Sequence, residues 1–391
     1  MTVASSSSKI IYVDNAATTR LDDDALALMF DLQRNFFANP SSAYKLSRPL
    51  KKILRESREK IAACINAEPQ EIIFTSGGTE SDNWAIKSVV LANLSERPNI
   101  ITSAVEHKAI LNSCAAMENL GCAVTKLLVD KFGAVNPNDW QKRILPQTKI
   151  ISVMLANNEV GTIQPIKSLV ETVHTAEKIF HTDAVQAVGH IPIDVKTLGI
   201  DMLSASAHKF NGPKGVGFLY VRDGLKISPY IDGGAQEFSR RAGTENVPAI
   251  AAMALALEKN CQYINQTAEK LSAYAKILLD CLQSNGVDFI LNGGKNRLPG
   301  HLSLSFKDCD GESLMHRLDL KNICVATGSA CNSQQTKISH VLQALKIPQD
   351  YIRGTIRITF GKENSHDDAK TIGNNLVKIL PPCQNQQFLI R

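Results

Sequence analysis

The sequence predicts an α/β fold, with a mostly parallel central sheet flanked by helices and a smaller α+β domain after it. Three observations support this prediction. Between residues 71 and 221, short apolar runs alternate with longer helix-like stretches, which is the pattern of a parallel sheet covered on both faces. After about residue 247 the pattern changes to long stretches rich in Ala and Leu. The 391 residues are 44% hydrophobic and 21% charged, which supplies enough apolar side chains for the cores of two domains.

Seven short apolar runs are the expected strands of the central sheet. In chain order they are Glu71–Ser76, Asn99–Ser103, Ala123–Val129, Lys149–Ala156, Lys178–Asp183, Met202–Ser206 and Val216–Val221. The helix-like stretches between them are Thr79–Leu94, Lys108–Leu120 and Ile166–Lys178. Because ligands bind at the carboxyl ends of strands in such a sheet, the residues that follow each strand are the first candidates for a site.

The region after residue 247 mixes helices and strands in a different order. Residues 247–285 predict one or two long helices. Strands are expected at His301–Phe306, Ile323–Thr327 and Thr355–Phe360. Helices are expected at Glu312–Leu318, Ile338–Leu345 and Ser365–Leu380. This mixture indicates a second, smaller α+β domain.

Composition and charge argue against several classes of protein. The net charge of +5 comes from 43 basic and 38 acidic residues scattered along the chain, which does not indicate nucleic-acid binding. No run of about 18 apolar residues is present, so a membrane span is not expected. The nine cysteines include no Cys-x-x-Cys pair, so we expect neither a disulfide scaffold nor a metal site. The Ser-rich start lacks the apolar segment of a secretory signal, and we expect a cytoplasmic protein.

The first informative motif lies where an expected strand leads into a helix. Residues 72–81 read Ile-Ile-Phe-Thr-Ser-Gly-Gly-Thr-Glu-Ser. Glycines let the backbone approach an anion, a helix start offers free N–H groups, and Thr79 adds a hydroxyl. The motif is neither a Walker loop nor Gly-x-Gly-x-x-Gly. By itself it predicts either a phosphate-binding turn or a simple helix start.

Two further polar residues stand where expected strands end. Asp183 closes one strand, and by itself it could be a helix N-cap. Lys209 follows another strand, beside His208 and before a Gly/Pro turn, and by itself it could be a solvated lysine. Together with the phosphate-binding turn they supply what a pyridoxal phosphate (PLP) site needs. These parts are a phosphate cup, a carboxylate for the pyridine nitrogen and a lysine for the Schiff base.

Longer motifs give the sequence a resemblance to a known family. They are Tyr12–Thr19, Asn39–Ser42, Thr75–Asn83, Glu106–Lys108, Asn157–Gly161, Ser206–Lys209, Arg240–Asn246, Gly328–Cys331 and Ile356–Gly361. In these motifs the chain resembles cysteine desulfurases of the NifS/IscS type, which are class-V aminotransferases with the fold of fold-type-I PLP enzymes. The resemblance implies a large PLP-binding domain at residues 15–262. It also implies a small domain, made of residues 1–14 and 263–391, that carries a mobile loop with the catalytic cysteine.

The resemblance implies a role for each matching residue around the cofactor. Lys209 would hold PLP in Schiff-base linkage, and Asp183 would pair with its pyridine nitrogen. Gln186 would hydrogen-bond the 3-oxygen of the ring. His107 would stack on the ring and help to move protons.

The remaining implied contacts concern the phosphate and the substrate. The phosphate ligands would be Gly78, Thr79, Ser206 and His208. Thr244 would reach a phosphate across the interface of an obligate homodimer, so that each site is built from two chains. Asn158 would contact both cofactor and substrate, and Arg357 would bind the substrate carboxylate by a bidentate pair.

Cys331 is the implied sulfur acceptor. It stands among small and polar residues between an expected strand and an expected helix, a composition typical of a mobile exposed loop. The implied reaction converts L-cysteine to L-alanine and leaves the sulfur as a persulfide on Cys331. An acceptor protein would then take the sulfur for iron–sulfur cluster assembly or tRNA thiolation. Since a thiol with a pKa of about 8.5 is mostly protonated at neutral pH, we expect His107 to help form the thiolate.

Two other interpretations stay open at the level of sequence. One is a different PLP enzyme on the same scaffold, such as a selenocysteine lyase, a cysteine lyase or an aminotransferase. The other is a catalytically silent protein that keeps the fold as a docking platform. The presence of Lys209, Asp183, His107 and Cys331 favours an enzyme. We expect no direct partner among nucleic acids or membranes.

Overall fold

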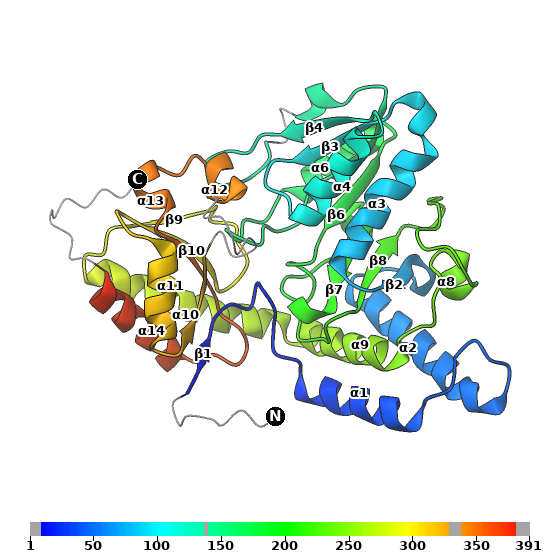
Figure 1. Cartoon of the computed structure of the whole chain (residues 1–391), viewed down its shortest axis with the longest axis horizontal. Coiled ribbons are helices and arrows are strands. Elements are labelled where there is room, and N and C mark those ends of the chain that lie inside the picture. The colour runs from blue at the N-terminus through cyan, green and yellow to red at the C-terminus, as the bar shows by residue number, and fades with distance from the viewer. Residues whose placement is uncertain (1–8, 137–139, 328–337, 381–391) are drawn as a thin grey trace.

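The central sheet has seven strands, and all but one of them run parallel (Figure 1). The computed structural model describes residues 9–136, 140–327 and 338–380. The spatial order of the strands is β2 (Ile72–Thr75), β8 (Gly217–Val221), β7 (Met202–Ser206), β6 (Ile179–Asp183), β5 (Thr148–Ser152), β3 (Asn99–Ser103) and β4 (Ala123–Leu127). Only β8 is antiparallel to its neighbours, β2 and β7. The predicted mostly parallel sheet is therefore confirmed.

Consecutive residues of these strands belong to different hydrophobic clusters. Ile100 and Ile150 pack in the cluster beneath α3 (Gly78–Ala92) and α4 (Lys108–Glu118), whereas Ile101 and Ile151 pack on the opposite face. That opposite face is covered by α2 (Arg48–Cys64), α6 (Ile166–Thr175) and α9 (Val247–Gln262). Successive side chains of a strand point to opposite faces of the sheet. A sheet that is covered on both faces therefore requires strands in which consecutive residues are apolar.

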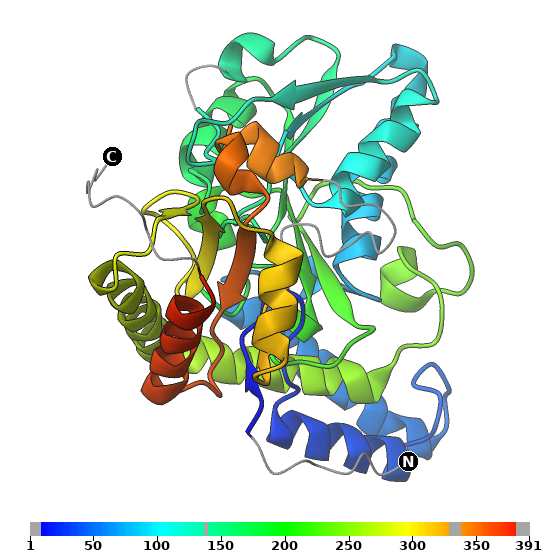
Figure 2. The ribbon, with the colours of Figure 1, turned by 60° about the vertical axis from the view of Figure 1, so that its left-hand side comes forward.

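A second, antiparallel sheet lies in the C-terminal part of the chain (Figure 2). Its strands, in order, are β12 (Ala326–Thr327), β13 (Thr355–Thr359), β10 (His301–Phe306) and β9 (Phe289–Leu291). They pack with α10 (Ile264–Ser284), α11 (Gly311–Asp319) and α14 (His366–Ile379) around a separate hydrophobic cluster. Two cores support the expected two domains, whose boundaries stay a prediction.

Two details of this region differ from the sequence prediction or sharpen it. The strand expected at Ile323–Thr327 is wrong as a single element, because β11 (Ile323–Cys324) pairs with β1 (Ile11–Tyr12) while β12 pairs with β13. The long helical stretch is two helices, α9 and α10, separated at Tyr263. Through β1, residues close to the N-terminus pack in the C-terminal core, where Ile11 and Val13 are buried.

The remaining helices were not predicted from the sequence. They are α1 (Asp23–Asn35) and the short α7 (Val195–Leu198), α8 (Gln236–Ser239) and α13 (Gln349–Ile352), whereas α12 (His340–Ala344) lies within the helix predicted at Ile338–Leu345. The helix α2 was also missed. Within the described residues, none of the helices has both the length and the apolar character to cross a membrane.

One buried ion pair covers the open edge of the central sheet at β2. Arg58 of α2 makes two hydrogen bonds to Glu237 of α8, with N–O distances of 2.8 and 2.7 Å. Glu237 also accepts a bond of 2.8 Å from the Phe74 backbone N–H, and Arg58 donates to the Ile72 carbonyl. Only 11% of the Arg58 side chain and 3% of the Glu237 side chain are exposed. Edge-strand groups that would otherwise be open to another chain are thus paired.

We predict that Arg58→Ala lowers the free energy of unfolding by about 3–5 kcal/mol, because it leaves the Glu237 carboxylate buried without its cation. Urea denaturation followed by circular dichroism measures this change. Lys60→Ala is the control on the same helix, since the Lys60–Glu258 pair is 43% and 45% exposed. It should cost less than about 1 kcal/mol. Equal losses in the two variants would contradict the prediction.

Candidate active site

A cavity of about 410 Å³ opens at the N-terminus of α3, where β2 turns into the helix. Its lining combines backbone groups, hydroxyls and basic side chains with one acidic side chain, Glu80, which is paired with Arg241. The lining residues are Ala17, Thr18, Ser76, Gly77, Gly78, Thr79, Glu80, Ser206, His208, Lys214 and Gly215. All four predicted phosphate ligands are among them. Thr18 and Lys214 also line the cavity but were not predicted as site residues. Their positions in the sequence do not show that their segments fold against the start of α3.

Close backbone packing forms the floor of this cavity. Gly77 has a φ of +145°, which side-chain-bearing residues rarely adopt. A Cβ on Gly217, the first residue of β8, would lie 2.4 Å from the Ala205 oxygen and 2.7 Å from the Gly77 Cα. The turn can therefore lie against the sheet only because these positions are glycines. The free N–H groups at the start of α3 and its dipole then favour an anion in the cavity.

His208 enters the cavity as a neutral imidazole at physiological pH. Burial lowers its pKa to about 4, and the charges of Lys209 and Lys214 act in the same direction. Its Nδ1 lies 3.1 Å from the Thr18 hydroxyl. A neutral ring can donate one hydrogen bond to an anion while Thr18 holds the other nitrogen.

Lys209 lies beside the cavity, just after β7. Its Nζ donates to the carbonyls of Ala16 and Ala17, at 2.7 Å each. Gln186, predicted to bind the cofactor ring, donates from Nε2 to the same Ala16 carbonyl at 2.9 Å. The amine predicted to form the Schiff base and the predicted ring ligand therefore meet at one point of the N-terminal segment. His190 fixes the Lys209 backbone by a contact of 2.8 Å to its carbonyl.

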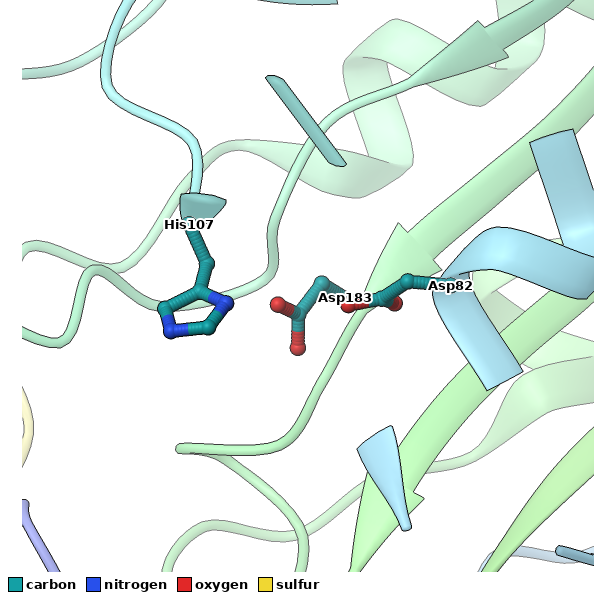
Figure 3. A group of neighbouring side chains, drawn as sticks. All are labelled: Asp82, His107 and Asp183. Carbon is teal, nitrogen blue, oxygen red and sulfur yellow. The ribbon is translucent and has the colours of Figure 1, made fainter. Parts of the chain in front are cut away.

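Asp183 and His107 come together at the ends of neighbouring elements (Figure 3). Asp183 ends β6 and accepts a bond of 2.9 Å from the Val185 N–H. Burial raises the pKa of Asp183, while His107 and Lys209 act in the opposite direction. His107 caps α4, with Nδ1 accepting from the Ala109 N–H at 3.2 Å. Because Nδ1 accepts this bond, the proton of a neutral ring lies on Nε2.

Asp82, which the sequence analysis gave no role, completes this group. Side-chain oxygen or nitrogen atoms of Asp82, His107 and Asp183 all lie within 4.8 Å of one another. Three donors at this separation are also a geometry that a metal ion can use, and the expected absence of a metal site stays a prediction. Asp82 comes four residues after Gly78, so in a helix both lie on the same face. Treating the motif as the start of a helix would therefore have predicted that Asp82 lies on the face of Gly78.

Arg357 is held at the second sheet by groups of the N-terminal and central segments. Its Nη2 donates to Asp14 at 2.6 Å, and its Nη1 donates to the backbone carbonyl of Asn158 at 2.9 Å. Its Nε is buried and has no hydrogen-bond partner in the part of the chain that the structure describes. Predicted substrate ligands Asn158 and Arg357 are thus neighbours, and these two bonds use only two of the five N–H groups of the arginine.

Glu106 anchors the segment that leads to His107. Its carboxyl accepts from the Met154 N–H at 2.9 and 3.1 Å and lies 2.5 Å from the Ser103 hydroxyl. Burial raises the pKa of Glu106 to about 8, with Asp183 acting in the same direction against the hydrogen bonds. The side chain is therefore largely protonated at neutral pH.

For two further predicted site residues, Thr244 and Cys331, the structure shows no contact with the other site residues. Thr244 is exposed and does not line it, although its segment is tied there by Arg241, which donates to Glu80 at 2.9 and 3.2 Å. An exposed Thr244 is compatible with the predicted contact to a second chain, which the single chain does not test. Cys331 lies outside the described residues.

Comparison with known proteins places the chain among enzymes of one family. The profile of the class-V aminotransferases matches residues 11–372. The chain is 43% identical over 385 residues to a cysteine desulfurase IscS from Methanosarcina thermophila, covering 98% of this chain and 95% of that protein. The solved structure of a NifS-like protein is 36% identical, with a TM-score of 0.90 over 95% of this chain and 99% of that one. A structure described as SspA in complex with cysteine is 35% identical, with a TM-score of 0.81 over 90% and 98%. The predicted fold class is confirmed.

We predict that Glu106→Gln removes one pH-dependent contribution to stability. The pKa of Glu106 is about 8 in the folded protein, compared with the usual 4.5. Between these two pH values the folded protein therefore holds a proton that the unfolded chain has lost. The wild type should therefore lose stability relative to the variant by about 1.4 kcal/mol per pH unit over that range. Urea unfolding at a series of pH values measures the difference. Glu171→Gln, on the exposed face of α6, is the control. Parallel stability curves for wild type and Glu106→Gln would contradict the assignment.

Proposed function

The chain belongs to the class-V aminotransferase family and is a cysteine desulfurase, and from this premise we propose that it uses PLP and carries the sulfur of L-cysteine on Cys331. The observation that supports this most directly is the position of Lys209 beside the cavity at the start of α3. A phosphate site next to a strand-end lysine and a buried aspartate is the arrangement that PLP needs.

The residues present fit this cofactor. The free N–H groups of α3, with Thr79, Ser206 and His208, suit its phosphate, and the glycine floor leaves room for it. Asp183 suits a protonated ring nitrogen, and Gln186 would turn from the Ala16 carbonyl to the ring oxygen. When bound, PLP would supply a sink for the electron pair released at the substrate Cα.

The side chains around the cofactor would divide the remaining tasks. Lys209 would release its two carbonyl partners on binding the cofactor and would later take the proton from the substrate Cα. His107 would exchange a proton at Nε2, since its Nδ1 is engaged by the helix N–H. Arg357 would bind the substrate carboxylate by a bidentate pair, turning from the Asp14 carboxylate that it contacts in the structure, with Asn158 beside it.

The sulfur step requires a thiolate at Cys331. The thiolate would attack the substrate Sγ, the Cβ–Sγ bond would break, and its electron pair would stay with carbon. A proton added at Cβ and a proton returned to Cα would complete L-alanine, while the transferred sulfur would remain on Cys331 as a persulfide. No external oxidant is needed, because the substrate Cβ keeps the electron pair of the broken Cβ–Sγ bond and is reduced as the sulfur becomes part of the persulfide.

The proposal extends to assembly and setting. An exposed Thr244 supports a homodimer in which it contacts the partner's phosphate. The persulfide would pass to an acceptor protein for iron–sulfur cluster assembly or tRNA thiolation in the cytoplasm. A selenocysteine or cysteine lyase on the same scaffold is the alternative function, and a reaction that proceeds without Cys331 would favour it.

We predict that the PLP-loaded protein, given L-cysteine and a reductant, releases alanine and sulfide in equal amounts. Cys331→Ser should retain the absorption of the bound cofactor and lose sulfide release by at least about a hundredfold, because the nucleophile is gone. Cys309→Ser, at a half-buried cysteine of the second domain, is the control. Alanine and sulfide from Cys331→Ser at the wild-type rate would reject the sulfur step and favour a lyase, which selenocysteine as substrate would then test.

We predict that Arg357→Lys raises the KM for L-cysteine about tenfold or more, since one fork of charge-assisted hydrogen bonds is lost. Cofactor binding should hardly change, because Arg357 does not line the phosphate cavity. Steady-state kinetics and cofactor absorbance separate the two effects. Arg353→Lys, on the exposed surface four residues earlier, is the matched control. An unchanged KM would reject the substrate role of Arg357.

A further inference from the structure

A second carboxyl group, that of Asp82, lies next to Asp183 on the side away from His107 (Figure 3). Asp82 projects from the first turns of α3, and only 1% of it is exposed, compared with 4% of Asp183. One oxygen atom of each carboxyl group lies within 4.8 Å of the other. Two carboxylates this close in a buried site cannot both be ionised at low cost, so the pair retains a proton.

The surroundings decide which of the two holds this proton. Burial raises the pKa of Asp82 most, the charge of Asp183 raises it further, and the Ser204 hydroxyl acts in the opposite direction. Asp183 also faces His107 and Lys209, which favour its ionised form. The proton therefore belongs on Asp82 and the negative charge on Asp183.

A neighbouring histidine does not change this assignment. His181 lies between the hydroxyls of Ser152 and Ser204, at 2.9 Å from each. Burial lowers the pKa of His181 to about 3, so the ring is neutral. Its Nε2 is 3.7 Å from Asp82 Oδ1, which has no hydrogen-bond partner among the described residues. A neutral imidazole at that distance gives Asp82 no counter-charge.

We propose that Asp82 is a positioning residue: as a neutral acid it donates a hydrogen bond to the Asp183 carboxylate and keeps that carboxylate ionised and aimed at the ring nitrogen of bound PLP. This inference rests on the proposed cofactor. A hydrogen bond to the charged form of an acid stabilises that form. Without it, burial would favour protonated Asp183, and the ring nitrogen would lose its proton to the aspartate.

The test replaces Asp82 in the PLP-loaded protein. Asp82→Asn keeps a donor without a charge, whereas Asp82→Leu and the smaller Asp82→Ala have neither. PLP labelled with nitrogen-15 in the ring reports by NMR whether that nitrogen is protonated, and the cofactor absorbance is followed across pH. Ser88→Ala is the control, because Ser88 lies on the same helix with a buried hydroxyl that has no partner among the described residues. EDTA in parallel samples tests for a metal ion at the three side chains.

The expected result separates the hydrogen bond from the charge. Asp82→Asn and Ser88→Ala should keep the nitrogen protonated over the wild-type pH range. Asp82→Leu or Asp82→Ala should move the nitrogen signal toward the unprotonated form. They should also weaken PLP binding about tenfold or more, the ratio for one lost hydrogen bond to a charged group.

Each other outcome overturns a stated part of the argument. If Asp82→Asn behaves like Asp82→Leu, the side chain acts as a charge and the inference fails. If no Asp82 variant alters the signal, Asp82 has only a structural role. If EDTA reproduces the effect of Asp82→Leu in the wild type, a metal ion holds the three side chains. If the wild type binds no PLP, the proposed function fails, and this inference fails with it.

Discussion

The candidate active site depends on a backbone contact that leaves no space for a side chain. Gly217 begins the only antiparallel strand of the central sheet and lies against both β7 and the turn before α3. A Cβ there would lie 2.4 Å from the Ala205 oxygen and 2.7 Å from the Gly77 Cα. This close approach brings the start of α3 to the end of β7, where Lys209 follows. The anion cavity and the lysine are neighbours for that reason.

A second constraint is the burial of acidic groups around the same strand ends. Burial raises the pKa of Glu106 to about 8, and it raises the pKa of Glu159 to about 7 against hydrogen bonding by Ser339 and the charge of Arg357. Asp183 lies among these groups but faces His107 and Lys209, so it is the carboxyl best placed to stay charged. Several carboxyl groups are thus buried together although burial disfavours their charged forms, and the negative charge is concentrated on Asp183. This is how perturbed acids mark functional sites.

Much of the architecture was predictable because it comes from local patterns. The seven strands of the central sheet appear as short apolar runs, and Asn99–Ser103 and Met202–Ser206 were predicted with the bounds that the structure has. The helices α1 and α2 were missed, since their charged faces resemble solvated loops in a single sequence. The residues from 323 to 327 form two strands because their partners, β1 and β13, come from distant parts of the chain.

The sequence by itself determined which residues could carry the chemistry, because a turn, a strand end and a lysine after a strand are local features. It identified Gly78, Asp183 and Lys209, and through the resemblance Arg357. Only the tertiary structure decided which groups these residues meet. Asp82 lies against Asp183 because α3 packs on β6, and Asp14 binds Arg357 across 343 positions of the chain. Ionisation states follow from such contacts and from burial, and both exist only once the chain has folded.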